Sequence, residues 1–287
     1  MFEGKKATKL LLGLTACALV GVTSTAEAAA QSWREITMSR KLEGAGPLRA
    51  EIAYGVGTFS LRGTDDDVLY RMALRYDEDK FEPVTEYTGE RLRIALEGGT
   101  HRLFWGGSED GGSMELELAR GVPMDLDLDF GAVKANVDLG GLALTDLELS
   151  TGASESRIDI SAPNPRQMGR AEFEVGAADF TVSNLGNLRA ERTEVHAGVG
   201  KVVLGLEGAW PTEARLGIDM GVGALELRIP EGLGVRVRKE SFLTSFDPEG
   251  LVKRGDSYYS LDWEEADRKL TINLNAAFGS VRVVWIQ

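Results

Sequence analysis

The sequence predicts an all-β protein, a stacked parallel β-solenoid with turns of about 22 residues and two short strands in each turn. One observation is a unit that occurs twice within residues 194–231, around Gly198 and again around Gly221. A second is that the same unit recurs around Gly55, Gly131, Gly176 and Gly279, and less completely around Gly152. The third is a nearly constant spacing, because the steps from Gly131 to Gly221 are 21, 24, 22 and 23 residues.

Each unit has apolar residues one and three positions before the glycine, and four and six positions after it. Around Gly221 these residues are Ile218 and Met220, then Leu225 and Leu227. In a continuous strand the two pairs would lie on opposite faces, since side chains alternate. A corner at the glycine, which has no Cβ and tolerates positive φ, would turn both pairs toward one interior. The corresponding positions elsewhere are Val195, Ala197, Val202 and Leu204; Ile52, Tyr54, Phe59 and Leu61; Leu128, Phe130, Ala135 and Val137; Phe173, Val175, Phe180 and Val182; and Ala276, Phe278, Val283 and Trp285.

The copy around Gly152 keeps Leu149 and Ile158 but has Ser156 at the fourth position after the glycine. An antiparallel β-sandwich also produces alternation of apolar residues. A regular period of 20 to 25 residues is more typical of stacked repeats, which bury their apolar faces against their neighbours. The spacing therefore favours the solenoid over the sandwich.

The chain divides into a leader (residues 1–28), a polar lead-in (29–47), an amino-terminal half (48–149) and a carboxy-terminal half (150–287) continuous with the first. Residues 241–260 are rich in charge, with Phe242, Phe246, Tyr258 and Tyr259, and predict a long loop that caps the end of the stack. Asp262 and Glu265 then match the D-x-x-E start of a short helix through Arg268.

The leader resembles a secretory signal. Lys5, Lys6 and Lys9 precede 13 apolar residues, 10–22, which is too short a stretch to span a bilayer. The sequence Ala26-Glu27-Ala28 is an A-x-A cleavage site. The alternative is a lipobox at residues 14–17, which would leave a lipidated Cys17 as a membrane anchor. Both readings predict an extracytoplasmic protein, periplasmic or secreted, and no later segment is apolar enough to be transmembrane.

Composition restricts the partners. The formal charge is −13, and it becomes −14 when the leader, which carries +1, is removed. This balance disfavours nucleic acid and anionic lipid, because both require a basic patch. Cys17 is the only cysteine, so a processed chain without it has neither disulfides nor a catalytic thiol.

Two blocks of sequence resemble known domains. Residues 61–70, Tyr76, 82–96, 122–126, 130–132, 142–149 and 151–153 resemble the amino-terminal toast-rack domain. Residues 221–235, 255–258, 263–270 and 278–281 are similar to the carboxy-terminal domain of LiaF-like cell-wall-antibiotic-response proteins. The resemblance implies a stacked β architecture and, for some members, an envelope-stress regulator that acts on a membrane kinase system. It implies no catalytic residues.

Motifs for chemistry are missing from the sequence. His101 and His196 lack the H-x-x-x-H or H-E-x-x-H spacing of a zinc site, and no G-x-S-x-G elbow occurs. Asp125, Asp127 and Asp129 alternate on one strand face, and Glu172 and Glu174 do the same. A solvated face explains these carboxylates best, and calcium bound to Asp125, Asp127 and Asp129 is the metal hypothesis that remains.

The sequence therefore predicts a non-catalytic envelope protein, a binding or scaffold module linked to the envelope-stress response, whose partner is an envelope protein or a glycan. No catalytic residue, cofactor or nucleic-acid site is expected. Two alternatives remain open: a carbohydrate-active lyase or glycosidase that uses surface carboxylates, and a surface adhesin.

Overall fold

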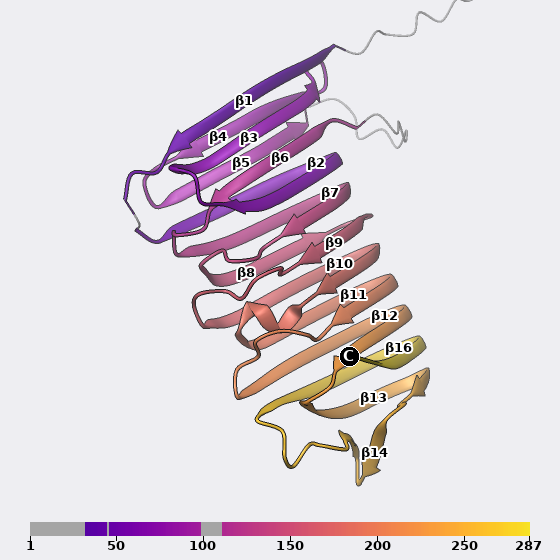
Figure 1. The fold of residues 1–287 in the computed structure, drawn as a ribbon. Helices are drawn as coiled ribbons and strands as arrows, with labels where there is room; N and C mark the ends of the chain where they lie inside the picture. The colour runs from indigo at the N-terminus through magenta and orange to yellow at the C-terminus, as the bar shows by residue number, and fades with distance from the viewer. Residues whose placement is uncertain (1–31, 45, 99–110) are drawn as a thin grey trace, which may run out of the picture. The chain divides into compact units, whose positions relative to one another are not determined.

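One sixteen-stranded β-sheet contains every strand of the described residues, which are 32–44, 46–98 and 111–287. This arrangement comes from a computed structural model, in which Ser32–Gln287 is one compact unit (Figure 1). The described residues include no α-helix, and none of their segments has the helical length and apolar composition to cross a bilayer. The all-β prediction is confirmed. The predicted signal, Cys17 and His101 lie outside the described residues.

The strands are β1 (Trp33–Lys41), β2 (Leu48–Thr64), β3 (Val68–Asp77), β4 (Phe81–Tyr87), β5 (Arg91–Gly98), β6 (Ser113–Ala119), β7 (Met124–Asp138), β8 (Leu144–Thr151), β9 (Glu155–Asp159), β10 (Met168–Ser183), β11 (Ala190–Gly205), β12 (Glu213–Pro230), β13 (Leu233–Asp247), β14 (Leu251–Arg254), β15 (Ser257–Ser260) and β16 (Arg268–Ile286). A 3-10 helix, η1 (Leu185–Leu188), connects β10 to β11.

The middle of the sheet is a parallel stack, in the order β2, β7, β8, β10, β11, β12, β16, β13 (Figure 1). Its register places like positions of successive repeats side by side: Val182 lies opposite Leu204, and Leu204 lies opposite Leu227. All three are buried in one hydrophobic core. The pairing excludes an antiparallel sandwich for this part of the chain. Burial of one strand face against the neighbouring repeats stabilises the stack at about 25 cal/mol per Å² of apolar surface removed from water.

Pairing near the amino terminus differs from the expected parallel pattern. β1 pairs antiparallel with β3, β3 with β6, and β4 with β5. β1 lies within the polar lead-in. Most of its side chains are exposed, so its sequence has no regular alternation of apolar and polar residues. Of these pairs, only β4 and β5 follow one another in the sequence and can be joined by a short hairpin; β1–β3 and β3–β6 are brought together from further apart.

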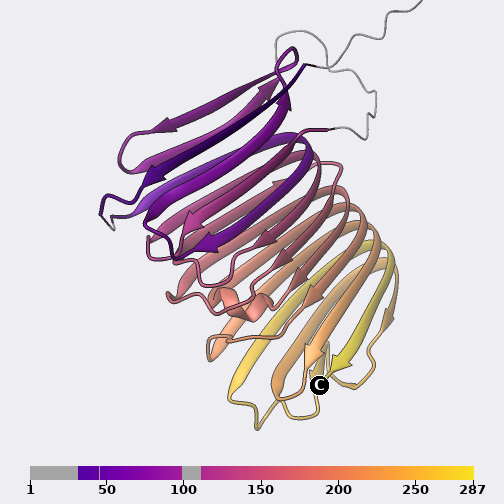
Figure 2. The same cartoon turned by 45° about the horizontal axis from the view of Figure 1, so that its top comes forward.

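The expected two short strands per repeat are one long strand in the structure. β10, β11 and β12 run unbroken through their glycines for 16, 16 and 18 residues, and Figure 2 shows these strands turning over at the corner. Backbone pairing continues on both sides of the corner, from Val175 opposite Ala197 to Ala177 opposite Val199. The side chains that face the core still change from odd to even positions, counted from each glycine. The apolar residues predicted before and after Gly176, Gly198 and Gly221 are all buried.

Stacked glycines make the corner. A Cβ on Gly176 would lie 2.8 Å from Gly152 O, one on Gly198 would lie 2.9 Å from Gly176 O, and one on Gly221 would lie 2.5 Å from Gly198 O. In these three corners the close approach of neighbouring backbones therefore favours glycine at the first position. Gly200 and Gly223, two positions later, have φ of 138° and 148°, which is the conformation that glycine tolerates.

The predicted alignment of the last repeat is wrong by two residues. Gly279 pairs with Gly223 rather than with Gly221, so Phe278 occupies the position of Val222. At that position side chains point outward, and Phe278 is 47% exposed instead of buried. The mismatch arises because this repeat has Ala277 where the others have their first glycine, and the sequence aligns on the glycine that remains.

The predicted long loop of residues 241–260 is mostly strand. It forms the end of β13 and the hairpin β14–β15, which turns at Gly255 with φ of 61°. β15 covers part of β13 by antiparallel pairing of residues 257–259 with residues 236–238. The final strand β16 enters between β12 and β13, so the carboxy terminus does not lie at the end of the stack. Residues 261–265 form turns and not the expected helix.

Two buried asparagines tie the connections together. Asn164 Nδ2 donates to Leu144 O (2.9 Å) and Leu188 O (3.2 Å). One repeat later, Asn187 Nδ2 donates to Ile160 O (2.8 Å), and its Oδ1 accepts from Ala209 N (3.0 Å). These bonds satisfy buried backbone groups at the start of β8 and in the connections between strands.

Candidate binding site

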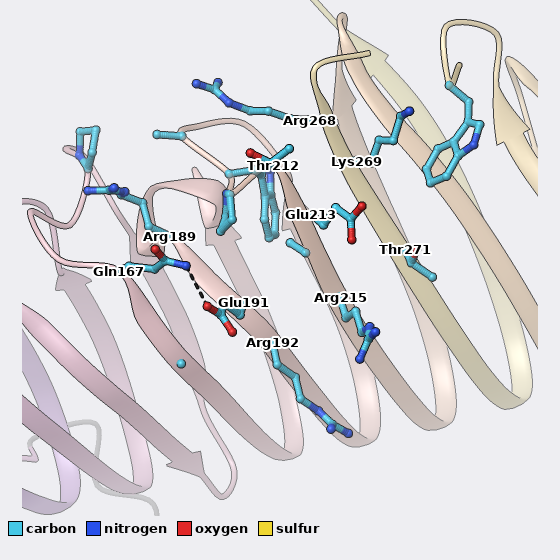
Figure 3. Close-up of a pocket in the computed structure, with 17 residues that line it drawn as sticks. Gln167, Arg189, Glu191, Arg192, Thr212, Glu213, Arg215, Arg268, Lys269 and Thr271 are labelled. Atoms are coloured by element: carbon cyan, nitrogen blue, oxygen red, sulfur yellow. Dashed lines mark hydrogen bonds between the residues drawn. The ribbon is translucent and has the colours of Figure 1, made fainter. Parts of the chain in front are cut away.

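A pocket of about 1160 Å³ lies where four parallel strands begin, with 17 residues lining it (Figure 3). Its wall consists of the first residues of β10, β11, β12 and β16 and of the segments that lead into them. Parallel strands bring their amino-terminal ends to one edge, so residues far apart in sequence meet here. Lys269 N donates to Thr212 O (2.9 Å) and anchors the start of β16 beside the segment before β12.

The pocket is basic although the chain is acidic. Five cations line it against two carboxylates, Glu191 and Glu213; the cations are Arg189, Arg192, Arg215, Arg268 and Lys269. The Glu191 carboxylate accepts from Gln167 Nε2 at 2.8 Å, the contact drawn in Figure 3. We call this site the basic pocket.

Arginine recurs in register on β10, β11 and β12, and two of the three arginines line the pocket. Arg170 lies opposite Arg192, and Arg192 lies opposite Arg215. The first two pair with an acid two residues later on the same strand: Arg170 with Glu172 and Arg192 with Glu194, both at 2.5 Å. In the third repeat the equivalent position is Gly217.

Arg215 thus lacks the acid that pairs with its counterparts. Within the described part of the chain, Arg192 is the pocket cation with a carboxylate inside 4 Å, and Arg189, Arg215, Arg268 and Lys269 have none. Arg189 Nη1 donates instead to the backbone carbonyl of Asn164 (3.1 Å). Side chains of Arg192 and Arg215 extend along their strands, and Arg268 projects from the other side of the pocket (Figure 3).

Two tryptophans border the basic pocket. Trp210 is buried, and its Nε1 donates to Leu206 O (2.6 Å), so the ring is fixed beneath the surface. Trp263 is half-buried and lies edge-on to Tyr259, with ring centroids 5.5 Å apart. Lys269 Nζ lies 5.6 Å from the Trp263 ring centroid, within cation–π distance. An aromatic face beside a cation suits a ligand that has both apolar and anionic parts.

Carboxylates singled out in the sequence lie elsewhere, on the outward face of the strands. Asp125, Asp127 and Asp129 occupy alternate positions of β7, so successive carboxylates along the strand are separated by two residues, roughly 6.6 Å. At that separation the three do not converge on one ion. Among residues 32–44, 46–98 and 111–287, no group of three or more His, Cys, Asp or Glu is placed to hold a metal.

Stacking gathers acids from different repeats instead. Glu51, Asp127, Glu148, Glu172 and Glu194 are successive partners in the register, and we call them the acidic column. Partial burial raises the pKa of Asp127, and the Glu51 carboxylate raises it further. Burial also raises the pKa of Glu148, with Asp127 and Glu172 adding to it. Glu174 lies two residues after Glu172 on β10, outside the acidic column, and is opposite His196 in the register.

His196 lies on the same outward face. Its Nδ1 is 3.3 Å from Asp219 Oδ2 and its Nε2 is 3.6 Å from Glu172 Oε1. Its side chain is 42% exposed, so it is a half-solvated residue of the outer strand face.

Sequence reasoning missed the basic pocket. Net charge averages over the chain, and it conceals five cations that the register gathers from residues 189–269. A usable signal was present in the repeat itself, because Arg-x-Glu at residues 170–172 and 192–194 becomes Arg-x-Gly at 215–217.

Comparison with known proteins gives a family and distant structural likenesses. The family model described as the N-terminal domain of toast_rack, DUF2154, matches residues 27–183. A search of curated proteins finds no match. A solved structure of a candidate cell adhesion protein from Clostridium sporogenes has 16% identity and a TM-score of 0.48, covering 89% of this chain and 100% of that one. A candidate adhesin from Bacteroides fragilis has 11% identity and a TM-score of 0.31, with 88% and 97% covered. A candidate lipid-binding protein from Parabacteroides distasonis has 10% identity and a TM-score of 0.28, with 91% and 98% covered.

The family match confirms the amino-terminal part of the predicted resemblance. It ends at residue 183, so the likeness of the carboxy-terminal part to LiaF-like proteins stays a prediction. Because the match covers more than half of the chain, the protein belongs to the family of toast_rack N-terminal domains, DUF2154.

Proposed function

We propose that the protein is a non-catalytic binding module of the cell envelope and that it binds an anionic ligand in the basic pocket. The observation that supports this most directly is Arg215, a cation that faces the pocket without the acid that pairs with its counterparts Arg170 and Arg192. Cations of this kind are available to a ligand. Parallel pairing of β11, β12 and β16 fixes the backbone positions that carry these cations before a ligand binds, which lowers part of the entropic cost of recognition.

The absence of catalysis is part of the proposal. Of the two pocket carboxylates, Glu191 already accepts a hydrogen bond from Gln167. The lyase or glycosidase alternative would need a pair of carboxylates around a substrate, and its candidates Asp127 and Asp129 lie on an outward strand face away from the pocket. An assay of the purified protein on envelope polysaccharides should release no new reducing ends, and Asp127→Asn with Asp129→Asn should change nothing. If the protein cleaves a polysaccharide and this activity is lost in the double variant, the protein is an enzyme and the proposal is wrong.

Location outside the cytoplasm is likewise proposed, on the leader sequence of residues 1–28. Expression of the full chain followed by cell fractionation tests it. A product shortened after Ala28 supports a periplasmic or secreted protein, and palmitate labelling that depends on Cys17 supports the lipoprotein. Protease shaving of whole cells distinguishes an adhesin, which would be cleaved at the cell surface, from a periplasmic module. Recovery of an unshortened chain in the cytosol would contradict both the cleaved and the lipidated form, and with them a location outside the cytoplasm.

Binding is tested by sedimentation with envelope fragments. The protein purified from the producing cells should pellet with isolated envelope material, and Arg215→Glu with Lys269→Glu should abolish this retention. Arg170→Glu is the matched control, because Arg170 has the same place in the register but does not line the pocket. Equal retention of all three proteins would contradict a function for the basic pocket.

Two finer assignments accompany the function. We propose that the parallel part is a β-solenoid, supported by strands β10, β11 and β12, which begin 22 and 23 residues apart in one register. We also propose that residues 221–287 are related to the LiaF-like carboxy-terminal domain and that the protein contributes to the envelope-stress response. A strain lacking the protein should then show an altered envelope-stress reporter after cell-wall antibiotic treatment, and an unchanged reporter would contradict this role.

A further inference from the structure

We infer that the ligand of the basic pocket is an acidic oligosaccharide, a short run of sugar rings that carry carboxylate or phosphate groups. This inference rests on the proposed function and names its ligand class. Figure 3 shows the cations that carry the argument, distributed around the pocket and not gathered at one point.

The spacing of the cations favours a ligand with several separate anionic groups. Arg192 and Arg215 lie on neighbouring strands in direct register, about 4.8 Å apart at the backbone. Lys269 is the second residue of the next strand, β16, and lies opposite Glu213. A single phosphate would engage one guanidinium or two, and it would leave other pocket cations that have no carboxylate within 4 Å among the described residues, such as Arg268 and Lys269, without an anionic partner. A chain of rings with an acid on each would pair with successive strands.

The size and the walls favour sugar rings. The volume of about 1160 Å³ exceeds the roughly 300–1,000 Å³ of pockets that hold one small molecule. Thr212 and Thr271 offer hydroxyl groups, and Trp263 offers an apolar face beside Lys269. Rings with an apolar face, hydroxyl groups and an anionic substituent match these three surfaces together.

The surroundings disfavour a long polyanion such as nucleic acid. Glu172 and Glu194 of the acidic column lie two residues from Arg170 and Arg192 on the same strands. A rod of continuous negative charge that crossed the pocket would also cross these carboxylates, and the whole chain has a formal charge of −13. Nucleic-acid binding surfaces are usually basic well beyond the contact site. A short oligomer can stay within the cationic area.

Calorimetry with defined probes tests the inference. The full protein is titrated with a short oligogalacturonate, with a glycerol phosphate oligomer, with a neutral oligogalactoside of equal length and with inorganic phosphate. We expect at least one acidic oligomer to bind, with an affinity that falls as salt is raised. The tighter of the two acidic oligomers tells whether carboxylate or phosphate is the natural group.

Arg215→Gln should weaken that binding about tenfold, because charge-assisted hydrogen bonds are lost. Arg170→Gln should leave it unchanged, and equal melting temperatures of the two variants show that both fold. Trp263→Ala should weaken the oligomers but not inorganic phosphate.

Results that contradict the inference can be distinguished from results that contradict the proposed function. Neutral oligomer bound as tightly as the acidic ones, inorganic phosphate bound as tightly as the oligomers, or an Arg215→Gln variant that binds like the parent each overturns the inference. Retention on envelope fragments without binding of either acidic oligomer also overturns it, while the proposed binding module stands. If the protein is not retained on envelope fragments and binds none of the probes, both the inference and the proposed binding function are contradicted.

Discussion

Gly217 lies directly opposite Glu194 in the parallel register of β11 and β12, and a Cβ on Gly217 would overlap the Glu194 carboxylate. Glu194 pairs with Arg192. The missing side chain at 217 therefore has two effects: it leaves room for the acid of the preceding repeat, and it leaves Arg215 without an acid of its own. One glycine thus makes a local excess of positive charge within an acidic repeat.

An acid introduced at position 217 should pair with Arg215 and weaken anion binding in the basic pocket. In Gly217→Glu, the new carboxylate lies two residues from Arg215, as Glu194 does from Arg192, and should pair with it. We expect anion binding to weaken about tenfold, and the melting temperature at pH 7 to fall by roughly 1–2 °C, because the new carboxylate stands opposite Glu194 at the end of the acidic column. Calorimetry with the acidic oligomers measures the effect. Gly217→Gln is the matched control, and an equal loss in both variants would indicate a steric effect and not charge.

Gly221 should not tolerate even a methyl group. In Gly221→Ala the Cβ would lie 2.5 Å from Gly198 O, so neighbouring strands must separate. We expect a loss of about 1–3 kcal/mol in the free energy of unfolding, measured by urea denaturation. Gly55→Ala is the control, because Gly55 begins the same column and a Cβ there has no described neighbour within 4 Å. Equal losses at both positions would show that backbone flexibility, and not close approach, explains the glycines.

The buried asparagine of the connections should be costly to remove. Asn187→Ala leaves Ile160 O and Ala209 N without the partners they have now. Unsatisfied buried groups cost about 1–3 kcal/mol each, so we expect a loss in that range or somewhat above it in urea denaturation. Asn273→Ala, on the exposed face of β16, should change the free energy of unfolding by less than about 0.5 kcal/mol. A loss at Asn187 no larger than at Asn273 would contradict the bridging role.

The acidic column should make stability depend on pH. The pKa values of Asp127 and Glu148 are raised above their ordinary values of 3.8 and 4.5, so the folded protein binds these protons more tightly than the unfolded chain. Their effect favours folding below the ordinary values and is lost as the pH rises. Asp127→Asn and Glu148→Gln should therefore raise the melting temperature at pH 7 by roughly 1–2 °C each. The gain should shrink as the pH falls toward 4.5.

Glu117 provides a control of opposite sign. Its pKa is lowered by hydrogen bonds from Arg62, with Arg71 adding to the effect, so its contribution is present above the ordinary value and lost as the pH falls. Glu117→Gln should lower the melting temperature at pH 7. A gain in this variant, or a gain in the column variants that grows toward acid pH, would show that other groups dominate the acid response.

Calcium should leave the acidic face unchanged. Asp125, Asp127 and Asp129 follow one strand at intervals of roughly 6.6 Å and do not converge. We expect melting temperatures in excess calcium and in chelator to agree within about 1 °C. An increase with calcium that is lost in Asp127→Asn would instead support calcium binding at these aspartates.

Sequence reasoning worked where a local pattern determines the structure. Alternation on both sides of Gly131 or Gly198 identified buried residues correctly, since each strand residue must face either the core or water. It failed at Gly279, where alignment on a glycine misplaced Phe278 by two positions. It also failed for residues 241–260, because charge and glycine in short outer strands resemble those of a loop.

The sequence by itself determined the β class, the recurring corners and the shared interior of the apolar residues, because these follow from side-chain period and from a residue without a Cβ. Only the tertiary structure decided which repeats lie side by side, where β16 enters the stack, and that five cations meet at one edge. The reason is physical: strand register is set by backbone pairing across the whole stack, and the charge at any point of the surface is the sum over strands that the sequence keeps apart.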